Sequence, residues 1–306
     1  MRSILLWMAS NPWLRERLPR LPFARRAVLR FMPGEDAASA LRAAKDFARE
    51  RIAVVLTRLG ENITRVEDGD EVAEHYLEVL GLIDSDGLDG EISVKLTQLG
   101  FDLDLGRTVA HVERLAARAA ANGKTVWIDM EGSAYTERTI ALYERVKRAQ
   151  PNVGVCVQSY LHRTAADLQR LVPLEPAIRL VKGAYAEPPT IAYQARAEVD
   201  ASFAALAVAM LEAKRSGRRI RIALGTHDVR LLEQITRHAD ALGLPHTAFE
   251  VQMLYGIRVG EQRRLAREGF VVRDLISYGS AWYPWYMRRL AERPANVIFA
   301  LRQLLP

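Results

Sequence analysis

The sequence has very little cysteine, which limits its chemistry and its compartment. Cys156 is the only cysteine among 306 residues, so no disulfide can form within the chain. It lies in the apolar run VGVCVQ, which predicts a buried core thiol rather than a reactive one. The first apolar run, ILLW, is too short for a signal-peptide core. These features predict a cytoplasmic protein.

Long hydrophobic runs are missing as well. No stretch approaches the roughly 18 to 20 uninterrupted apolar residues that a membrane-spanning helix needs. The hydrophobic content of 49% is nevertheless ample for a large core. We therefore expect a globular protein without a membrane span.

Several common catalytic signatures are absent too. The sequence has no Gly-x-Gly-x-x-Gly after a strand, no Walker loop, no His-Glu-x-x-His and no Gly-x-Ser-x-Gly. These absences exclude the usual dinucleotide site of a Rossmann fold, a P-loop, a zincin and an α/β-hydrolase. The six histidines are scattered, so no metal site is predicted. Only His227, in LGTHD, directly follows a predicted strand.

Positive charge is concentrated at the start of the chain. Residues 1–31 hold seven arginines and one glutamate, a net charge of +6, whereas the remainder sums to zero. Trp7, Trp13 and further apolar residues lie between these arginines, which is typical of a basic amphipathic segment. Two interpretations stay open: a helical arm packed on the body with a solvated basic face, or peripheral contact with anionic lipid on the inner face of the membrane. No nucleic-acid motif accompanies the charge, so we expect no nucleic-acid partner.

Eight apolar, β-branched runs alternate with helix-period segments along the rest of the chain. Near-continuous apolar strands separated by helices indicate a parallel sheet buried on both faces. Eight such units predict a (β/α)8 barrel over residues 49–306, preceded by a helical arm over residues 1–48, with an open doubly wound sheet as the alternative. The expected strands are 52–57, 92–97, 125–130, 153–158, 178–183, 220–225, 249–254 and 270–275. The clearest expected helices are 107–122, 135–149, 195–216 and 228–242.

Polar residues recur at or near the ends of these strands, where the active sites of such barrels gather. They contain many hydrogen-bond donors and one main acid, which indicates a cavity for an anionic, hydrogen-bonding ligand. The set comprises Lys95, Asp129, Gln158, Arg179, Lys182, Thr226, His227 and Gln252, with Arg288 and Arg289 on the last helix.

Seven sequence blocks, taken together, resemble one family. They are ISVKLTQLG, IDMEGS, VCVQSYLHRT, IRLVKGAY, LGTHD, FEVQMLYGIR and MRRLAERPAN. In this order and spacing they resemble the proline dehydrogenases, of the monofunctional bacterial type, across nearly the whole chain. The resemblance implies a distorted (β/α)8 barrel whose last helix lies over the C-terminal mouth. It also implies FAD as cofactor, oxidation of L-proline to Δ1-pyrroline-5-carboxylate by hydride transfer to flavin N5, and membrane quinone as electron acceptor.

The resemblance also assigns roles to individual residues. Asp129 is the expected active-site aspartate, and Arg179 the expected arginine beside flavin N5. The expected substrate contacts are Lys95, the carboxylate-binding pair Arg288 and Arg289, and Glu292, which orients that pair. The expected FAD contacts are Met130, Gln158, Arg179, Lys182, Gly183, Ala184, Thr226 and His227.

Two positions depart from the family pattern. Leu275 stands where the family commonly has a tyrosine able to bond the aspartate, and Trp285 stands in place of a second pocket tyrosine. Tyr278 is a candidate to replace the missing hydroxyl, provided that the backbone takes a different course; Tyr278 and Trp285 are both expected to touch the substrate. These departures leave open a related cyclic amino acid, such as hydroxyproline, as substrate. A non-catalytic membrane-surface protein with the same barrel is the alternative from another class.

Overall fold

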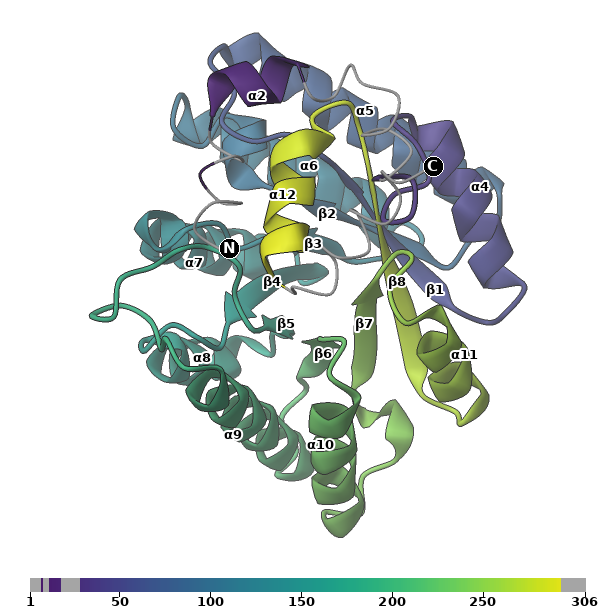
Figure 1. Cartoon of the computed structure of the whole chain (residues 1–306), viewed down its shortest axis with the longest axis vertical. Coiled ribbons are helices and arrows are strands. Elements are labelled where there is room, and N and C mark those ends of the chain that lie inside the picture. Colours follow the sequence, from purple (N-terminus) through teal and green to yellow (C-terminus); the bar gives the residue numbers. More distant parts are fainter. Residues whose placement is uncertain (1–6, 8–10, 18–27, 293–306) are drawn as a thin grey trace.

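Eight parallel strands form one closed barrel in the computed structural model, which describes Trp7, residues 11–17 and residues 28–292 (Figure 1). The strands follow one another around the barrel in chain order, and β8 pairs with β1 to close it. The closure confirms the predicted barrel and excludes the open sheet. The strands are β1 Ala53–Arg58, β2 Gly90–Val94, β3 Val126–Ile128, β4 Val153–Gln158, β5 Ala177–Val181, β6 Arg221–Gly225, β7 Glu250–Leu254 and β8 Val271–Tyr278.

Amphipathic helices cover the outside of the barrel. In α6, for example, Asp104 caps the N-terminus by accepting from Arg107 N at 2.9 Å, and Val109, Val112 and Leu115 face the core. The helices between the strands are α5 Val66–Ser85, α6 Leu105–Ala120, α7 Ser133–Ala149, α8 Thr164–Leu171, α9 Arg196–Arg215, α10 Val229–Ala241 and α11 Val259–Arg267. Short 3-10 helices are η2 Leu96–Leu99, η3 Val172–Leu174 and η4 His246–Ala248.

The helix α4, Ala37–Ala48, completes this outer ring although it precedes the first strand. Asp36 caps it by accepting from Ser39 N at 2.6 Å. Its buried face, which includes Leu41 and Phe47, joins the main core cluster and contacts β1 and β8. This helix therefore occupies the place that a helix after β8 would take, and it shares the core of the barrel even though it lies before residue 49.

The last helix, α12 Trp282–Glu292, lies over the mouth of the barrel instead of in the ring (Figure 1). Its buried residues, including Trp282 and Tyr286, form a separate cluster with Leu59, which follows β1, and Ile257, which follows β7. Because both neighbours follow the C-terminal ends of strands, α12 covers that end of the barrel. The expected position of the last helix is confirmed.

The interior of the barrel is layered. At the base, an ion-pair cluster joins Glu91 and Glu250 to Arg221 and Arg273. Above it lies an apolar layer of Val55, Trp127, Ala177, Ala223 and Leu275. Polar side chains, described below, occupy the upper part. Side chains thus fill the interior at its base, and the polar side chains gather toward the C-terminal end, where barrels of this kind hold their ligands.

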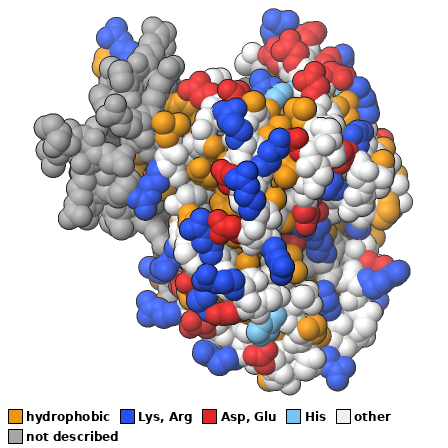
Figure 2. All heavy atoms as spheres, turned by 90° about the vertical axis from the view of Figure 1, so that its right-hand side faces the viewer, with side chains coloured by type: hydrophobic (Ala, Val, Ile, Leu, Met, Phe, Trp, Pro, Cys, Tyr) orange, Lys and Arg blue, Asp and Glu red, His pale blue; other side chains and the backbone are white. Residues whose placement is uncertain are grey.

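Charges on the described surface are largely paired. Figure 2 shows Lys and Arg interleaved with Asp and Glu on the side of the molecule that carries α4, where Arg263 pairs with Glu50 and Lys45 with Asp86. Within Trp7 and the described residues 11–17 and 28–292, no helix has the length and apolar character needed to cross a membrane.

Candidate active site

A compact polar cluster around Asp129 lies at the C-terminal end of β2, β3 and β5. Lys95 Nζ donates to Asp129 Oδ2 at 2.8 Å, and Ser93 Oγ donates to Asp129 Oδ1 at 2.7 Å. Arg179 Nη2 donates to the same Oδ1 at 2.5 Å and approaches Ser93 Oγ at 2.6 Å. The structure thus brings together three residues that the sequence had placed on separate strands, Lys95, Asp129 and Arg179.

The two cations fix the charge state of Asp129. Burial opposes ionisation, but Lys95 and Arg179 outweigh it and lower the pKa of Asp129 to about 2. Burial likewise opposes the charge on Lys95, and the Asp129 and Glu61 carboxylates reverse this and raise its pKa above the ordinary range. Asp129 is therefore a carboxylate and Lys95 an ammonium at neutral pH.

Arg179 is supported from below as well. Its Nη1 donates to Gln252 Oε1 at 3.2 Å, and Gln252 Nε2 donates to Glu250 Oε1 at 2.6 Å. The guanidinium lies over the Trp127 ring, with its central carbon 5.1 Å from the ring centroid. Arg221 lies 5.0 Å from the same centroid. Trp127 therefore lies against one arginine of the upper cluster and one of the base.

Gln158 and Met130 lie beside this cluster at the ends of β4 and β3. Both are buried, and Gln158 Nε2 approaches the Met130 and Glu131 carbonyl oxygens at 3.4 and 3.3 Å. Gln158 Oε1 is buried and has no hydrogen-bond partner among the described residues. A buried amide oxygen without a partner is costly, so this end of β4 is suited to a ligand that donates a hydrogen bond.

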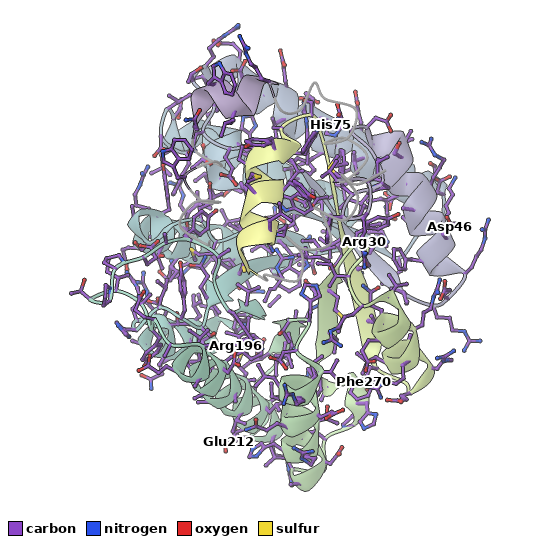
Figure 3. All side chains as sticks on the ribbon, in the orientation of Figure 1. Arg30, Asp46, His75, Arg196, Glu212 and Phe270 are labelled. Carbon is purple, nitrogen blue, oxygen red and sulfur yellow. The ribbon has the colours of Figure 1, made fainter. Side chains whose placement is uncertain are left out.

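The ends of β5 and β6 bring most of the remaining expected cofactor contacts together. Lys182 Nζ lies 3.1 Å from Asp228 Oδ2 and also pairs with Asp200. Arg196, labelled in Figure 3 at the start of α9, reaches Asp228 at 3.2 Å. The half-buried Gly183 and Ala184 follow Lys182 directly.

Thr226 and His227 fix the turn after β6. Thr226 Oγ1 accepts from Asp228 N at 3.2 Å, and His227 Nε2 accepts from Leu254 N at 2.9 Å. A ring nitrogen that accepts a backbone N–H carries no proton, so His227 is neutral and its proton lies on Nδ1. His227 thereby ties the end of β6 to the end of β7.

The predicted residues of α12 are described only in part. The backbone of the helix covers the mouth, but the side chains of Arg288 and Glu292 lie outside the described residues. Arg289 is half-buried. Trp285 is buried in the apolar cluster that α12 forms with Leu59 and Ile257.

Tyr278 is not brought to the cluster. Strand β8 runs without interruption to Tyr278, so side chains alternate along it, and those of Arg273 and Leu275 face the interior. Tyr278 therefore faces outward, where its hydroxyl bonds His75 Nε2 at 2.8 Å. His75, labelled in Figure 3, belongs to α5, in the ring outside the strands. The different backbone course that would turn Tyr278 inward does not occur.

Two residues of the cluster were missed as site residues. Ser93 bonds both Asp129 and Arg179, and Gln252, although noted as a strand-end polar residue, was given no role. Strand alternation was the available signal for Ser93, because it lies two residues before Lys95 and shares its face. Leu275 is half-buried and packs against the interior apolar layer.

Comparisons with known proteins agree with this geometry. Residues 40–302 match the family described as Proline dehydrogenase. The chain is 35% identical over 311 residues to Proline dehydrogenase from Deinococcus radiodurans, covering 99% of this chain and 97% of the relative. It is 32% identical over 305 residues to Proline dehydrogenase 1 from Bacillus subtilis subsp. natto, covering 100% and 99%.

A solved structure shows the same fold. The crystal structure of proline utilization A from Bdellovibrio bacteriovorus, inactivated by N-propargylglycine, superposes with a TM-score of 0.81 at 21% identity. The match covers 95% of this chain and 38% of that longer protein. From the family match and the full-length relatives, the chain belongs to the proline dehydrogenase family of oxidoreductases.

Proposed function

We propose that this chain is an FAD-dependent proline dehydrogenase that oxidises L-proline to Δ1-pyrroline-5-carboxylate and passes the electrons to a quinone. The observation that carries the proposal is the cluster of Asp129, Lys95 and Arg179 at the C-terminal end of the barrel, in a chain of this family. Two cations around one buried carboxylate leave positive charge for an anionic substrate or for the negative charge of a reduced cofactor.

The residues at the barrel mouth fit FAD. Gln158 Oε1 is a buried acceptor that lacks a partner among the described residues, as expected where a donor from a ligand belongs. Arg179 offers a permanently charged donor group. The remaining contacts in this proposal are Met130, Lys182, Gly183, Ala184, Thr226 and His227, at the ends of β3, β5 and β6. FAD, when bound, supplies the hydride acceptor; the chain supplies orientation and charge.

Side chains of α12 and the Asp129 cluster orient the substrate in this proposal. Arg288 and Arg289 bind the proline carboxylate because a guanidinium matches a carboxylate in shape and charge, and Glu292 orients the pair. Lys95 is an ammonium and Asp129 a carboxylate around neutral pH, so both present charge beside the substrate. Proline enters with a neutral amine, and the carbon beside its nitrogen gives up the hydride. The position of α12 over the mouth shields this step from water.

Membrane contact through the basic arm fits a quinone acceptor. In α2, Pro12–Arg17, Trp13 is 59% exposed and Arg17 lies over its ring at 4.9 Å. Trp7 is 61% exposed. Exposed tryptophan beside arginine is typical of a segment at a lipid interface. In this proposal residues 1–31 hold the otherwise cytoplasmic enzyme at the membrane surface where quinone is dissolved.

A second candidate substrate is a related cyclic amino acid such as hydroxyproline. The half-buried Leu275 favours it, because an aliphatic side chain borders the interior space where the family pattern has a tyrosine. Losing a polar contact changes discrimination between substrates more than altering an apolar contact does. Trp285 supports the second candidate substrate for one reason: it stands where the family pattern has a second pocket tyrosine.

An anaerobic absorbance spectrum tests these proposals. We expect a flavin band after purification with added FAD, and bleaching of that band by L-proline. Bleaching by hydroxyproline but not by proline would favour the second candidate. A chain that takes up no FAD would contradict both candidate substrates and favour the non-catalytic alternative.

Sedimentation with anionic vesicles tests membrane contact through residues 1–31. We expect a Trp7→Ala, Trp13→Ala variant to bind the vesicles more weakly than wild type.

A further inference from the structure

Gln252 is the only described residue that links the polar cluster at the mouth to the charged base of the barrel through direct side-chain hydrogen bonds. It accepts from Arg179 Nη1 at 3.2 Å and donates to Glu250 Oε1 at 2.6 Å. Arg179, Gln252 and Glu250 are all at least nine-tenths buried. Glu250 is held in turn by Arg221, at 2.8 and 3.1 Å. An unbroken series of bonds therefore runs from the base to the guanidinium.

The chemistry of these partners fixes the orientation of the Gln252 amide. A carboxylate only accepts hydrogen bonds and a guanidinium only donates them. The NH2 group of Gln252 must therefore face Glu250, and its oxygen must face Arg179. The reversed amide would place two acceptors together at Glu250 and two donors together at Arg179, in a buried site where each mismatch is costly.

The neutrality of Gln252 is equally important. Arg179 already shares the Asp129 carboxylate with Lys95. A second carboxylate at position 252 would neutralise Arg179 and place like charges beside each other at Glu250. A neutral amide orients the guanidinium without compensating its charge. Trp127 supports the same orientation from below through its ring face, and Gly154 gives that ring room, because a Cβ there would lie 2.6 Å from it.

We propose that Gln252 is a positioning residue for electron transfer: it holds Arg179 at the flavin edge through the series of bonds from Glu250 without placing a second negative charge beside the guanidinium. The inference rests on the proposed function, since it requires flavin at the barrel mouth. Gln252 itself touches neither substrate nor flavin in this proposal and acts through Arg179.

Two nearly isosteric variants separate orientation from charge. Gln252→Met removes both hydrogen bonds of Gln252. We expect kcat for proline to fall about tenfold while KM changes little, because Arg179 is then no longer held to donate to the charge that develops on the flavin. Gln252→Glu, measured at alkaline pH where the new carboxyl is ionised, is expected to lower the midpoint potential of the bound flavin. A purely structural role would lower thermal stability without moving that potential.

A double-mutant cycle with Arg179→Lys supplies the control. Lysine keeps the charge but lacks the Nη1 group that bonds Gln252, so Gln252→Met should cost little more in kcat on this background. If the losses in kcat from Gln252→Met and Arg179→Lys were fully additive, the inference would be overturned. It would also be overturned if Gln252→Met kept the wild-type kcat and Gln252→Glu kept the wild-type flavin potential. A wild-type chain that takes up no flavin would instead overturn the proposed function, and this inference with it.

Discussion

Arg179 Nη2 donates a 2.5 Å hydrogen bond to Asp129 Oδ1, and this bond joins β5 to β3 across the interior of the barrel. Strand β4 lies between β3 and β5 and pairs in parallel with both, so the bond depends on the register of these three strands. The cluster around Asp129 therefore contributes to the stability of the barrel as well as to its chemistry.

Asp129→Asn should destabilise the protein in a pH-dependent way. Lys95 and Arg179 overcome burial and lower the pKa of Asp129 from 3.8 to about 2. A lowered carboxyl pKa stabilises the folded state, and this contribution to the free energy of unfolding is complete above pH 4. It amounts to roughly 2 kcal/mol and is lost as the pH falls through 2. Urea unfolding at pH 7 and pH 3 measures it: the advantage of wild type over the variant should shrink at pH 3. An equal difference at both values would contradict the ionic account.

The order of the elements could be predicted from the sequence, because apolar strand runs and helical periodicity are local properties. The expected strand 153–158 coincides with β4 Val153–Gln158, and the expected helix 135–149 lies within α7 Ser133–Ala149. The third strand is shorter than expected, covering Val126–Ile128, because the polar cluster begins at Asp129. The eighth runs three residues beyond its expected end, to Tyr278.

The interior partners were harder to predict because they meet across the barrel. The contact of Gln252 with Glu250 is local to β7, because residues two apart on a strand share a face. The contact with Arg179 depends on the stagger of β5, β6 and β7, and nothing local to Gln252 indicates it. The direction of Tyr278, in contrast, was predictable. It lies an odd number of residues from the inward-facing Leu275, so an uninterrupted strand must turn it outward toward His75.

Asp274→Asn should stabilise the protein at neutral and alkaline pH. Asp274 is fully buried on the outward side of β8, and this burial raises its pKa well above 3.8, with Gln262 opposing the shift only in part. A raised carboxyl pKa means that stability falls as the pH rises above 4, because ionisation favours the unfolded chain. We expect a gain in stability at pH 8 and none near pH 4.

Thermal unfolding of wild type and variant across this pH range measures the effect of Asp274. Asp46, labelled in Figure 3, supplies the matched control Asp46→Asn, because its side chain is 72% exposed and pairs with the exposed Arg49. That variant should change little at any pH. A variant Asp274→Asn that is less stable than wild type at pH 8 would show that the buried carboxylate has a compensating partner.

Leu275→Tyr should change which ring the enzyme prefers. Leu275 is half-buried against the interior apolar layer, and a tyrosine there would add a larger ring and a hydroxyl to the barrel interior. We expect the ratio of kcat/KM for proline to that for hydroxyproline to rise about tenfold or more. Leu275→Phe fills the same space without the hydroxyl and separates the steric part from the polar part. Equal ratios in all three proteins would remove Leu275 as a determinant of specificity.

Gly183→Ala should weaken both the fold and the proposed cofactor site. Gly183 has φ +112, and a Cβ there would lie 2.3 Å from the Tyr160 ring, so the substitution adds a steric clash to an unfavourable backbone conformation. Gly217→Ala is the matched control, since its φ is +93 and a Cβ would meet nothing within 4 Å. The control should lose about 1 kcal/mol from the backbone alone, and Gly183→Ala about 2 kcal/mol more. Because Gly183 lies between Lys182 and Ala184, FAD affinity measured by fluorescence quenching should fall only in the Gly183 variant. If both variants lost the same stability and FAD affinity were unchanged, the turn after β5 would accommodate the added Cβ without a change at the mouth of the barrel.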